Sequence, residues 1–456
     1  MVQYSRLKRG MKFLPVLLIA WATVWVIAPR WGAATIRRPR STYDVRWRIV
    51  GGARTTHRFF DSSALSPSGR YVCATRTARE GPADVTPGDV AEVVVYDLQK
   101  KRKDRFALVY RRPTAAWDAQ LGAQVQWGAS DAELYFNDVI GTKNDGAPVV
   151  RGVQSYWQSG REVSLPTPIY HVTRDGALAA APRDLAALRL TQDGYGVVVT
   201  PKQLRNLPQK DGVHILNLKT NATSFLELKT LVAKAELDER PRAVAGGITR
   251  TGSECHRHVF HVKWNAQGAR LLVVVRARGR GCPRGDANHA LTVNPDGSEV
   301  RVVATWLRDG NHPNWLEDGR LSMNYERNVC AFDDAEGAPC QTLSERASGH
   351  PVGVIGRESL VVTDTYGKEH AAFGLEAGEA ALRVLSGAKE AWLGVFPIAA
   401  YGTMPTDVWR CDMHPAFDLK GKRLAINVWT HGARRVAVTD EIDWDALLKR
   451  RDLWFS

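Results

Sequence analysis

The chain has 456 residues, of which 44% are hydrophobic, and a formal net charge of +14. This length and composition suit a globular protein with one large repeat domain or two to three ordinary domains. Residues 1–40 hold eight Lys and Arg and no acidic residue, so the rest of the chain carries only +6. That mildly basic body suits an acidic ligand. The sequence lacks the zinc-finger spacing or Arg-rich recognition helix typical of nucleic-acid-binding proteins, so we expect no nucleic-acid partner.

The N-terminus has the layout of a targeting segment. Basic residues precede the apolar run 13–28, and small residues follow at 32–34. This order is typical of a secretory signal, and the run is slightly short for a transmembrane helix of about 20 residues. We therefore expect residues 1–40 to be a signal peptide or a membrane anchor through 13–28. The protein would then be exported, either periplasmic or extracellular, or anchored facing outside.

Beyond this segment, short apolar strands separated by Gly, Pro, Asp and Asn turns dominate. Seven turns each lead into an apolar strand, and they lie at 66–69, 127–131, 172–176, Gly268, Gly319, Gly356 and Gly421. Blades of a β-propeller repeat about every 40 to 50 residues, and each blade is a four-stranded sheet placed radially around a channel. The sequence therefore predicts an all-β protein, with one seven-bladed β-propeller domain over residues 41–456.

Two other features bear on this domain. Residues 183–255 are the least regular part and predict a long excursion over one face of the propeller, where function often resides. Six cysteines permit disulfides in an exported protein, and Cys330–Cys340 and Cys255–Cys282 each flank a predicted hairpin. Cys73 lies in an apolar strand and is expected to be a buried thiol.

One unit recurs in the second half of the chain: a histidine, a turn with glycine, and an apolar strand. Its copies begin at His312, His350 and His414, each followed by proline, and a looser copy begins at His261. Equivalent positions of a repeat converge around its axis, whereas a stack of separate sandwich domains would leave the recurrence unexplained. Asp412 lies two residues before His414, so both side chains share a face if the segment is extended.

These residues predict a metal site. His312, His350, Asp412 and His414 offer the imidazole and carboxylate ligands that suit manganese, zinc or another divalent ion. A buried histidine bonded to a neighbouring backbone group is the alternative for any one copy. His261 lacks the proline and is a candidate general base, since the unperturbed pKa of histidine is about 6.5. No Gly-x-Ser-x-Gly, phosphate-loop or dinucleotide-binding glycine pattern is present.

The motifs around these histidines resemble those of the oligogalacturonate lyase family, seven-bladed propellers that cleave uronate-containing oligosaccharides by β-elimination. The resemblance covers residues 255–440, with weaker similarity at 117–138. Its motifs are His261 before Trp264, the segment 312–315 before Asp318-Gly319, Gly349-His350 before 359–364, and the segment 412–417. Two positions depart from the family: Asp412 replaces a histidine, and Trp409 stands where a glutamine is expected.

The resemblance implies roles for single residues. His261 would be the proton-abstracting base, and His312 and the last motif, at 412–417, would bind manganese, with zinc or calcium as alternatives. The family also uses an arginine upstream of the base, for which Arg242 is the candidate and Arg240 the fallback. The implied activity is that of a carbon–oxygen lyase on an acidic, pectin-like glycan. A non-catalytic, membrane-tethered propeller that binds or scaffolds is the alternative.

Overall fold

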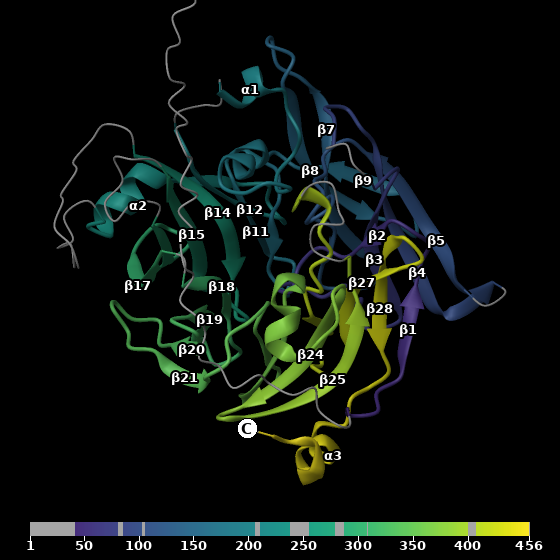
Figure 1. Cartoon of the computed structure of the whole chain (residues 1–456). Helices are drawn as coiled ribbons and strands as arrows, with labels where there is room; N and C mark the ends of the chain where they lie inside the picture. The colour runs from purple at the N-terminus through teal and green to yellow at the C-terminus, as the bar shows by residue number, and fades with distance from the viewer. Residues whose placement is uncertain are drawn as a thin grey trace, which may run out of the picture.

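Seven four-stranded antiparallel sheets surround a common axis (Figure 1). The computed structural model describes residues 42–80, 85–102, 105–205, 210–237, 255–278, 287–307, 309–399 and 407–455. The predicted signal or anchor lies outside these residues. Among the helices of the described ranges, none is long and apolar enough to cross a membrane.

Six of the seven sheets consist of consecutive strands, ordered from the axis outward. The first three sheets are β2 (Thr55–Thr56), β3 (Tyr71–Thr77), β4 (Ala91–Arg102) and β5 (Arg105–Thr114); β6 (Gln126–Trp127), β7 (Glu133–Thr142), β8 (Pro148–Tyr156) and β9 (Arg161–Ser164); and β10 (His171–Val172), β11 (Leu178–Pro182), β12 (Gly212–Asn217) and β13 (Thr223–Glu227). The next three are β14 (His256–Trp264), β15 (Leu271–Arg278), β16 (Asn288–Val293) and β17 (Arg301–Trp306); β18 (Gly310–Trp315), β19 (Leu321–Tyr325), β20 (Asn328–Phe332) and β21 (Gln341–Ser344); and β22 (Val352–Val354), β23 (Arg357–Asp364), β24 (Glu379–Ser386) and β25 (Lys389–Pro397).

The seventh sheet joins the two ends of the chain. It contains β26 (Ala416–Phe417), β27 (Leu424–Thr430) and β28 (Ala433–Thr439), and its outermost strand is β1 (Trp47–Val50). Trp47 pairs with Thr439 and Val50 with Val436. The first strand of the described residues thereby completes the last blade, which closes the ring and covers the outer edge of β28.

The apolar strands are continuous runs because the sheets pack face to face. Every residue of β16 is buried, as is the Leu271–Val275 part of β15. A strand buried on both faces needs an apolar run rather than alternation. All seven predicted turns fall between the first and second strands of a sheet. Gly421 has φ +66°, and a Cβ there would lie 2.6 Å from Ile355 of the preceding blade. Glycine therefore fits this turn on both counts.

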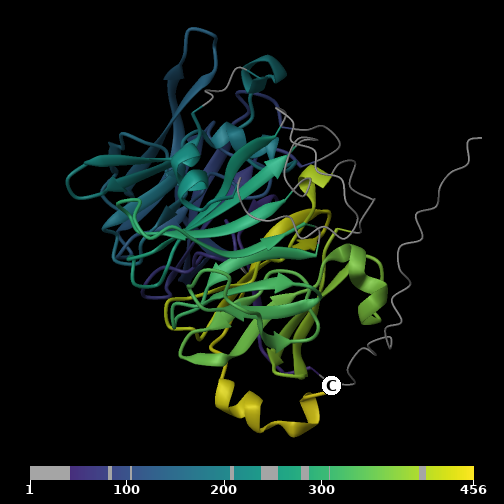
Figure 2. The ribbon, with the colours of Figure 1, turned by 90° about the vertical axis from the view of Figure 1, so that its left-hand side faces the viewer.

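The helices are short and lie outside the sheets. They are η1 (Leu185–Leu190), α1 (Pro201–Arg205), α2 (Leu228–Lys234), η2 (Gly367–Phe373), η3 (Asp407–Trp409), α3 (Trp444–Lys449) and η4 (Arg451–Leu453). Figure 2 shows α3 beyond the lower edge of the sheets, close to the C-terminus.

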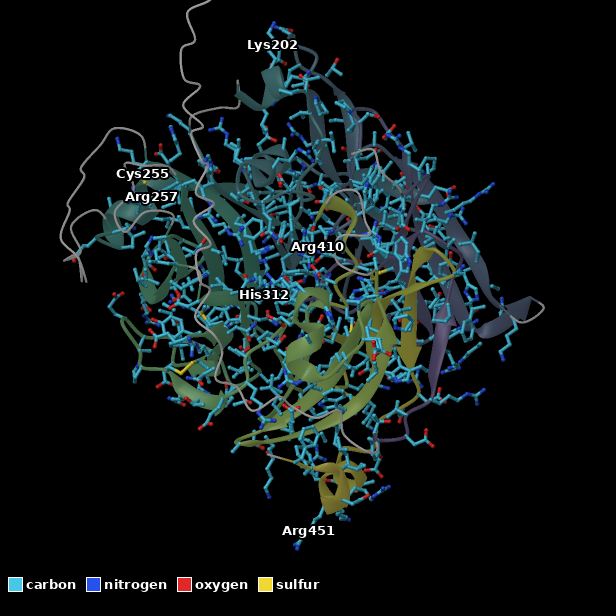
Figure 3. All side chains as sticks on the ribbon, viewed as in Figure 1. Lys202, Cys255, Arg257, His312, Arg410 and Arg451 are labelled. Carbon is cyan, nitrogen blue, oxygen red and sulfur yellow. A yellow bond between two sulfur atoms is a disulfide. The ribbon has the colours of Figure 1, made fainter. Side chains whose placement is uncertain are left out.

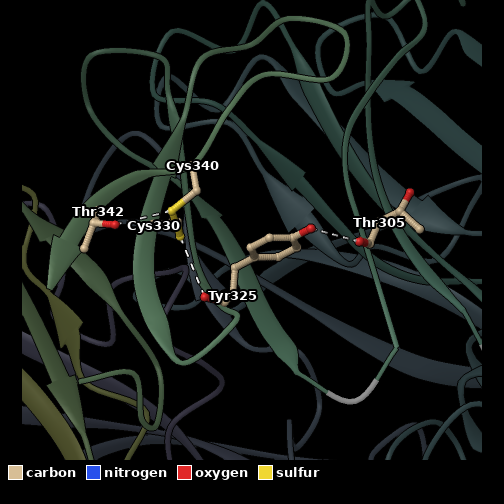
Figure 4. The surroundings of a disulfide bond; sticks show 5 residues. All are labelled: Thr305, Tyr325, Cys330, Cys340 and Thr342. Carbon is tan, nitrogen blue, oxygen red and sulfur yellow. Dashed lines mark hydrogen bonds between the residues drawn. A yellow bond between two sulfur atoms is a disulfide. The ribbon is translucent and has the colours of Figure 1, made fainter. Parts of the chain in front are cut away.

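The disulfide prediction is confirmed for Cys330–Cys340, which bridges β20 and the segment leading to β21 (Figure 4). Cys73 is a buried free thiol, as predicted, and Cys411 is a second one. Cys282, the predicted partner of Cys255, lies outside the described residues.

Candidate metal and catalytic site

Three histidines from three successive blades meet at one end of the channel. The ring centroids of His312 and His350 lie 4.0 Å apart, and those of His350 and His414 lie 4.4 Å apart. All three side chains are buried. Figure 3 places His312 and Arg410 in the middle of the ring of sheets. The convergence expected from the repeat is therefore present.

An irregular backbone aims these rings at the axis. His312 has φ 58° and His414 has φ 50°, a left-handed conformation that residues other than glycine rarely adopt. The pairing of β18 with β19 shifts register between Asn311 and Asn314, around the His-Pro pair. Proline cannot donate to the ladder, so a bulge here costs no hydrogen bond at that position. Such local strain is typical of a functional site.

The nitrogen and oxygen atoms of this cluster fit a divalent cation. His350, Asp412 and His414 offer one ligand atom each, all within 4.8 Å of one another. Nδ1 of His350 lies 2.9 Å from the Asp364 carboxylate, and Nε2 of His350 has no hydrogen-bond partner. A carboxylate behind a histidine fixes the tautomer whose other nitrogen binds a metal. Both ring nitrogens of His414 are also buried without a hydrogen-bond partner.

His312 lies beside this triad rather than fully within it. Its Nδ1 is 2.7 Å from the Gly349 carbonyl oxygen, and its Nε2 is 3.3 Å from the Tyr366 hydroxyl. Burial, followed by the nearby His350, holds the pKa of both His312 and His414 well below 6.5. Both rings are therefore neutral at neutral pH, as metal ligands must be.

His261 faces the same cluster from β14. The pairing of β14 with β15 shifts register between Val259 and Val262, which places a bulge at His261. Nδ1 of His261 shares a short hydrogen bond with the Tyr170 hydroxyl, and its ring stacks on Phe59 with centroids 5.1 Å apart. Burial, and then the charges of Lys263 and Arg276, hold the pKa of His261 well below 6.5. The ring is thus neutral, which a proton acceptor requires.

Residues 57–62, here called the axial segment, fill the channel beneath the histidines. The Phe59 ring contacts His261, His350 and His414, with its centroid 4.6 Å from that of His414. The Lys263 ammonium lies 4.2 Å from the Phe60 ring centroid and 3.6 Å from Asp61. The segment separates the histidine-bearing mouth of the channel from the opposite mouth, where a cavity of about 120 Å³ lies.

The sequence did not indicate the axial segment, Tyr170 or Lys263 as site residues. A usable signal exists for Tyr170, which immediately precedes the inner strand β10, much as His350 lies two residues before the inner strand β22. No comparable signal exists for Lys263, whose Nζ donates to the Pro313 carbonyl oxygen of the next blade at 2.9 Å. That contact depends on how the blades are placed.

The part of the predicted excursion around Tyr195 lies at the histidine-bearing mouth, whereas Gly212–Asn217 and Thr223–Glu227 of the same range form strands β12 and β13 of the third sheet. The side-chain amide of Gln120 donates to the carbonyl oxygen of Val408. Its backbone N–H donates to the Asp118 carboxylate and to the Gly194 carbonyl oxygen. This links η3 to the segment around Tyr195, whose ring lies edge-on to His261 at 5.8 Å. Arg242 and Arg240, the predicted catalytic arginine and its fallback, lie outside the described residues.

A ring of seven sheets with a histidine–carboxylate cluster at one end of its channel defines a β-propeller with a buried candidate metal centre. No family model and no curated protein matches the sequence. Among solved structures, the chain is similar to an oligogalacturonate lyase in complex with manganese, at 11% identity and TM-score 0.50, over 90% of this chain and 99% of that one. It is also similar to an oligogalacturonate lyase from Vibrio parahaemolyticus, at 10% identity and TM-score 0.51, over 89% of this chain and 97% of that one. The chain therefore has the fold of these lyases over nearly its full described length.

Proposed function

We propose that this protein is a polysaccharide lyase that cleaves uronate-containing oligosaccharides by β-elimination with a histidine base. The observation that carries the proposal is the meeting of His350, Asp412 and His414 with His261 at one mouth of the channel. The fold shared with two oligogalacturonate lyases supports it. We also propose export, with 13–28 as signal or tether.

The triad His350, Asp412 and His414 would hold a divalent ion, with His312 adjacent. We propose manganese, with zinc or calcium as alternatives, because imidazole and carboxylate ligands accept all of these ions. The ion, when bound, supplies positive charge that neutralises the substrate carboxylate and so acidifies the neighbouring carbon. Asp364 keeps the lone pair of His350 Nε2 directed at the site.

His261 then removes the proton beside the carboxylate. Nε2 is the accepting atom in the tautomer whose Nδ1–H donates to the Tyr170 hydroxyl oxygen. The negative charge of a bound substrate raises the low pKa of His261 and so strengthens it as a base in the complex. Tyr195 keeps its proton because burial raises its pKa to about 12, and its hydroxyl faces the same mouth as donor to the leaving oxygen. The carbon–oxygen bond breaks and an unsaturated uronate forms.

One assay tests this function directly. The full chain, supplied with manganese, zinc or calcium, is incubated with oligomers of galacturonate, guluronate, mannuronate and glucuronate. Appearance of the ultraviolet absorbance of the unsaturated product, abolished by His261→Ala, supports the proposal. New reducing ends without that absorbance would identify a hydrolase instead. Absence of any product, together with no bound metal by elemental analysis, would leave the non-catalytic binding protein as the better account.

A further inference from the structure

Two arginines outside the metal triad converge on Tyr195 at the histidine-bearing mouth. The NH2 group of Arg410 donates to the Tyr195 hydroxyl at 3.4 Å. The charges of Arg276 and Arg410 act on each other, and both act on the hydroxyls of Tyr195 and Tyr366. The charge of Arg276 also acts on His261 and His312. Both guanidinium groups therefore lie near the proposed base.

Arg276 is held rigidly but lacks an anionic partner. Its guanidinium carbon lies 3.7 Å from the Phe260 ring centroid, and its NH1 group donates to Gln192 at 2.8 Å and to the Thr191 carbonyl at 3.1 Å. Its Nε is buried with no hydrogen-bond partner. In the described part of the chain, no carboxylate lies within ion-pair distance of Arg276. A buried cation without a counter-ion is costly unless a ligand supplies one.

Arg410 pairs with the Asp412 carboxylate beside Arg276. Its Nε donates to Oδ2 of Asp412 at 2.7 Å, and its side chain is 20% exposed, so it also reaches solvent at the mouth. The charges of Arg278 and Arg410 both act on Arg276. Burial lowers the pKa of Arg276 to about 9, and the group still carries its charge at neutral pH. Arg276 therefore presents a positive charge that pairs with no carboxylate of the described residues.

We propose that Arg276 and Arg410 bind a carboxylate of the substrate and set the preference for acidic over neutral sugars. A planar guanidinium group matches a carboxylate with two parallel hydrogen bonds, which an ammonium group does not. Phe260 and Gln192 hold Arg276 in place before the ligand arrives, so little side-chain entropy is lost on binding. The choice of a uronate carboxylate rests on the proposed function.

The test measures binding separately from turnover. The full chain carries His261→Ala to prevent reaction and is freed of metal with EDTA. Calorimetry then follows binding of the trisaccharides of galacturonate, guluronate, mannuronate and glucuronate, and of fully methyl-esterified trigalacturonate. Arg276→Gln, Arg276→Lys and Arg410→Gln are compared with this parent. Arg161→Gln is the matched control, because Arg161 also stacks on an aromatic ring, that of Tyr156, but lies on the outer strand β9.

Loss of a charged, bidentate hydrogen bond is expected to weaken binding of the preferred acidic trisaccharide by roughly 10- to 100-fold in either Gln variant. Arg276→Lys should fall between parent and Arg276→Gln, Arg161→Gln should match the parent, and the methyl ester should bind weakly to all. If Arg276→Gln does not fold, Arg410→Gln and Arg276→Lys decide. The proposal would be overturned if the variants at both arginine positions bound with the affinity of the parent. It would also be overturned if the parent bound no acidic trisaccharide. Binding by the parent without turnover by the wild type would refute the lyase and leave the carboxylate site standing.

Discussion

Tyr170 and His261 share a buried hydrogen bond between the phenol oxygen and Nδ1 of the imidazole. Tyr170 immediately precedes the first strand of its blade, and His261 lies on the first strand of the neighbouring blade. Burial raises the pKa of Tyr170 well above 10, so its hydroxyl stays protonated. The bond fixes the orientation of the His261 ring and leaves Nε2 as the nitrogen that faces the site.

Tyr170→Phe removes this bond and keeps the ring. The guanidinium group of Arg58 lies 4.8 Å from the Tyr170 ring centroid and retains its aromatic partner in the variant. We expect kcat to fall by roughly tenfold, as for loss of one hydrogen bond at a catalytic group, with KM little changed. Steady-state kinetics on the preferred uronate oligomer measure this. Tyr135→Phe is the control, because Tyr135 is equally buried and its hydroxyl accepts from Gln154, remote from the mouth. A change in KM with kcat unaltered would contradict the role given to Tyr170.

The carboxylate behind His350 should tune metal affinity without touching the metal. Asp364→Asn leaves a side chain of the same size but weakens the bond to Nδ1 of His350, so we expect manganese affinity to fall by about 10- to 100-fold. His414→Ala, which removes a ligand, should abolish stoichiometric binding. Calorimetric titration with manganese and zinc measures both. His258→Ala, which changes a histidine outside the cluster, should titrate like the wild type; equal losses in all three variants would argue against a site at the triad.

The blade count was predictable because its signals are local. A glycine turn such as Gly421 needs only its own backbone and the adjacent blade, and the Leu271–Val275 run of β15 is apolar because both its faces are covered. His312, His350 and His414 recur at equivalent positions in the sequence, and they meet in the structure because the fold repeats around an axis.

The rest of the site depends on contacts that no local pattern encodes. The axial segment enters the channel after a strand of only two residues, and the position of Phe59 between three histidines requires the closed ring. A bulge sets the direction in which the His261 side chain points. In a regular strand, His261 would simply point to the face opposite that of His258. Asp412 and His414 do face together, with 3.9 Å between Oδ2 and Nε2, although the segment before β26 is not a strand.

Lys263 should control the acid limb of the pH profile. Its positive charge is the largest cause, after burial, that lowers the pKa of His261. Removing it in Lys263→Met makes protonated His261 less unfavourable, so the pKa of His261 rises and activity is lost at a higher pH on the acid side. The pH dependence of kcat/KM shows the shift. Lys234→Met is the control, since Lys234 also donates to a backbone carbonyl, that of Gly297, but lies on α2. An unmoved acid limb would mean that another group limits the reaction at low pH.

His171 should make the fold sensitive to mild acid. Its Nδ1 accepts from the Trp264 amide at 3.1 Å and its Nε2 donates to the Asp61 carbonyl at 3.1 Å, so the folded state holds a neutral ring. Burial lowers the pKa of His171 from 6.5 to about 4. Because this folded-state pKa is depressed, its contribution is fully present above pH 6.5 and is lost as the pH falls toward 4. The unfolded chain binds a proton in this window and the folded one does not, which lowers the free energy of unfolding by about 2 kcal/mol between pH 7 and pH 5.

Urea unfolding of EDTA-treated protein at pH 7 and pH 5 measures this loss. His57, whose pKa burial also lowers to about 4, adds a second contribution of the same sign, so the wild type should lose more than one histidine accounts for. His171→Asn removes one titrating group. It is expected to be less stable at pH 7, because the bonds to Trp264 and Asp61 are lost, but to lose less stability between pH 7 and pH 5 than the wild type. The exposed His431→Asn serves as control and should leave the pH dependence unchanged. Equal acid sensitivity in His171→Asn and the wild type would show that His171 is not the group that couples protonation to unfolding.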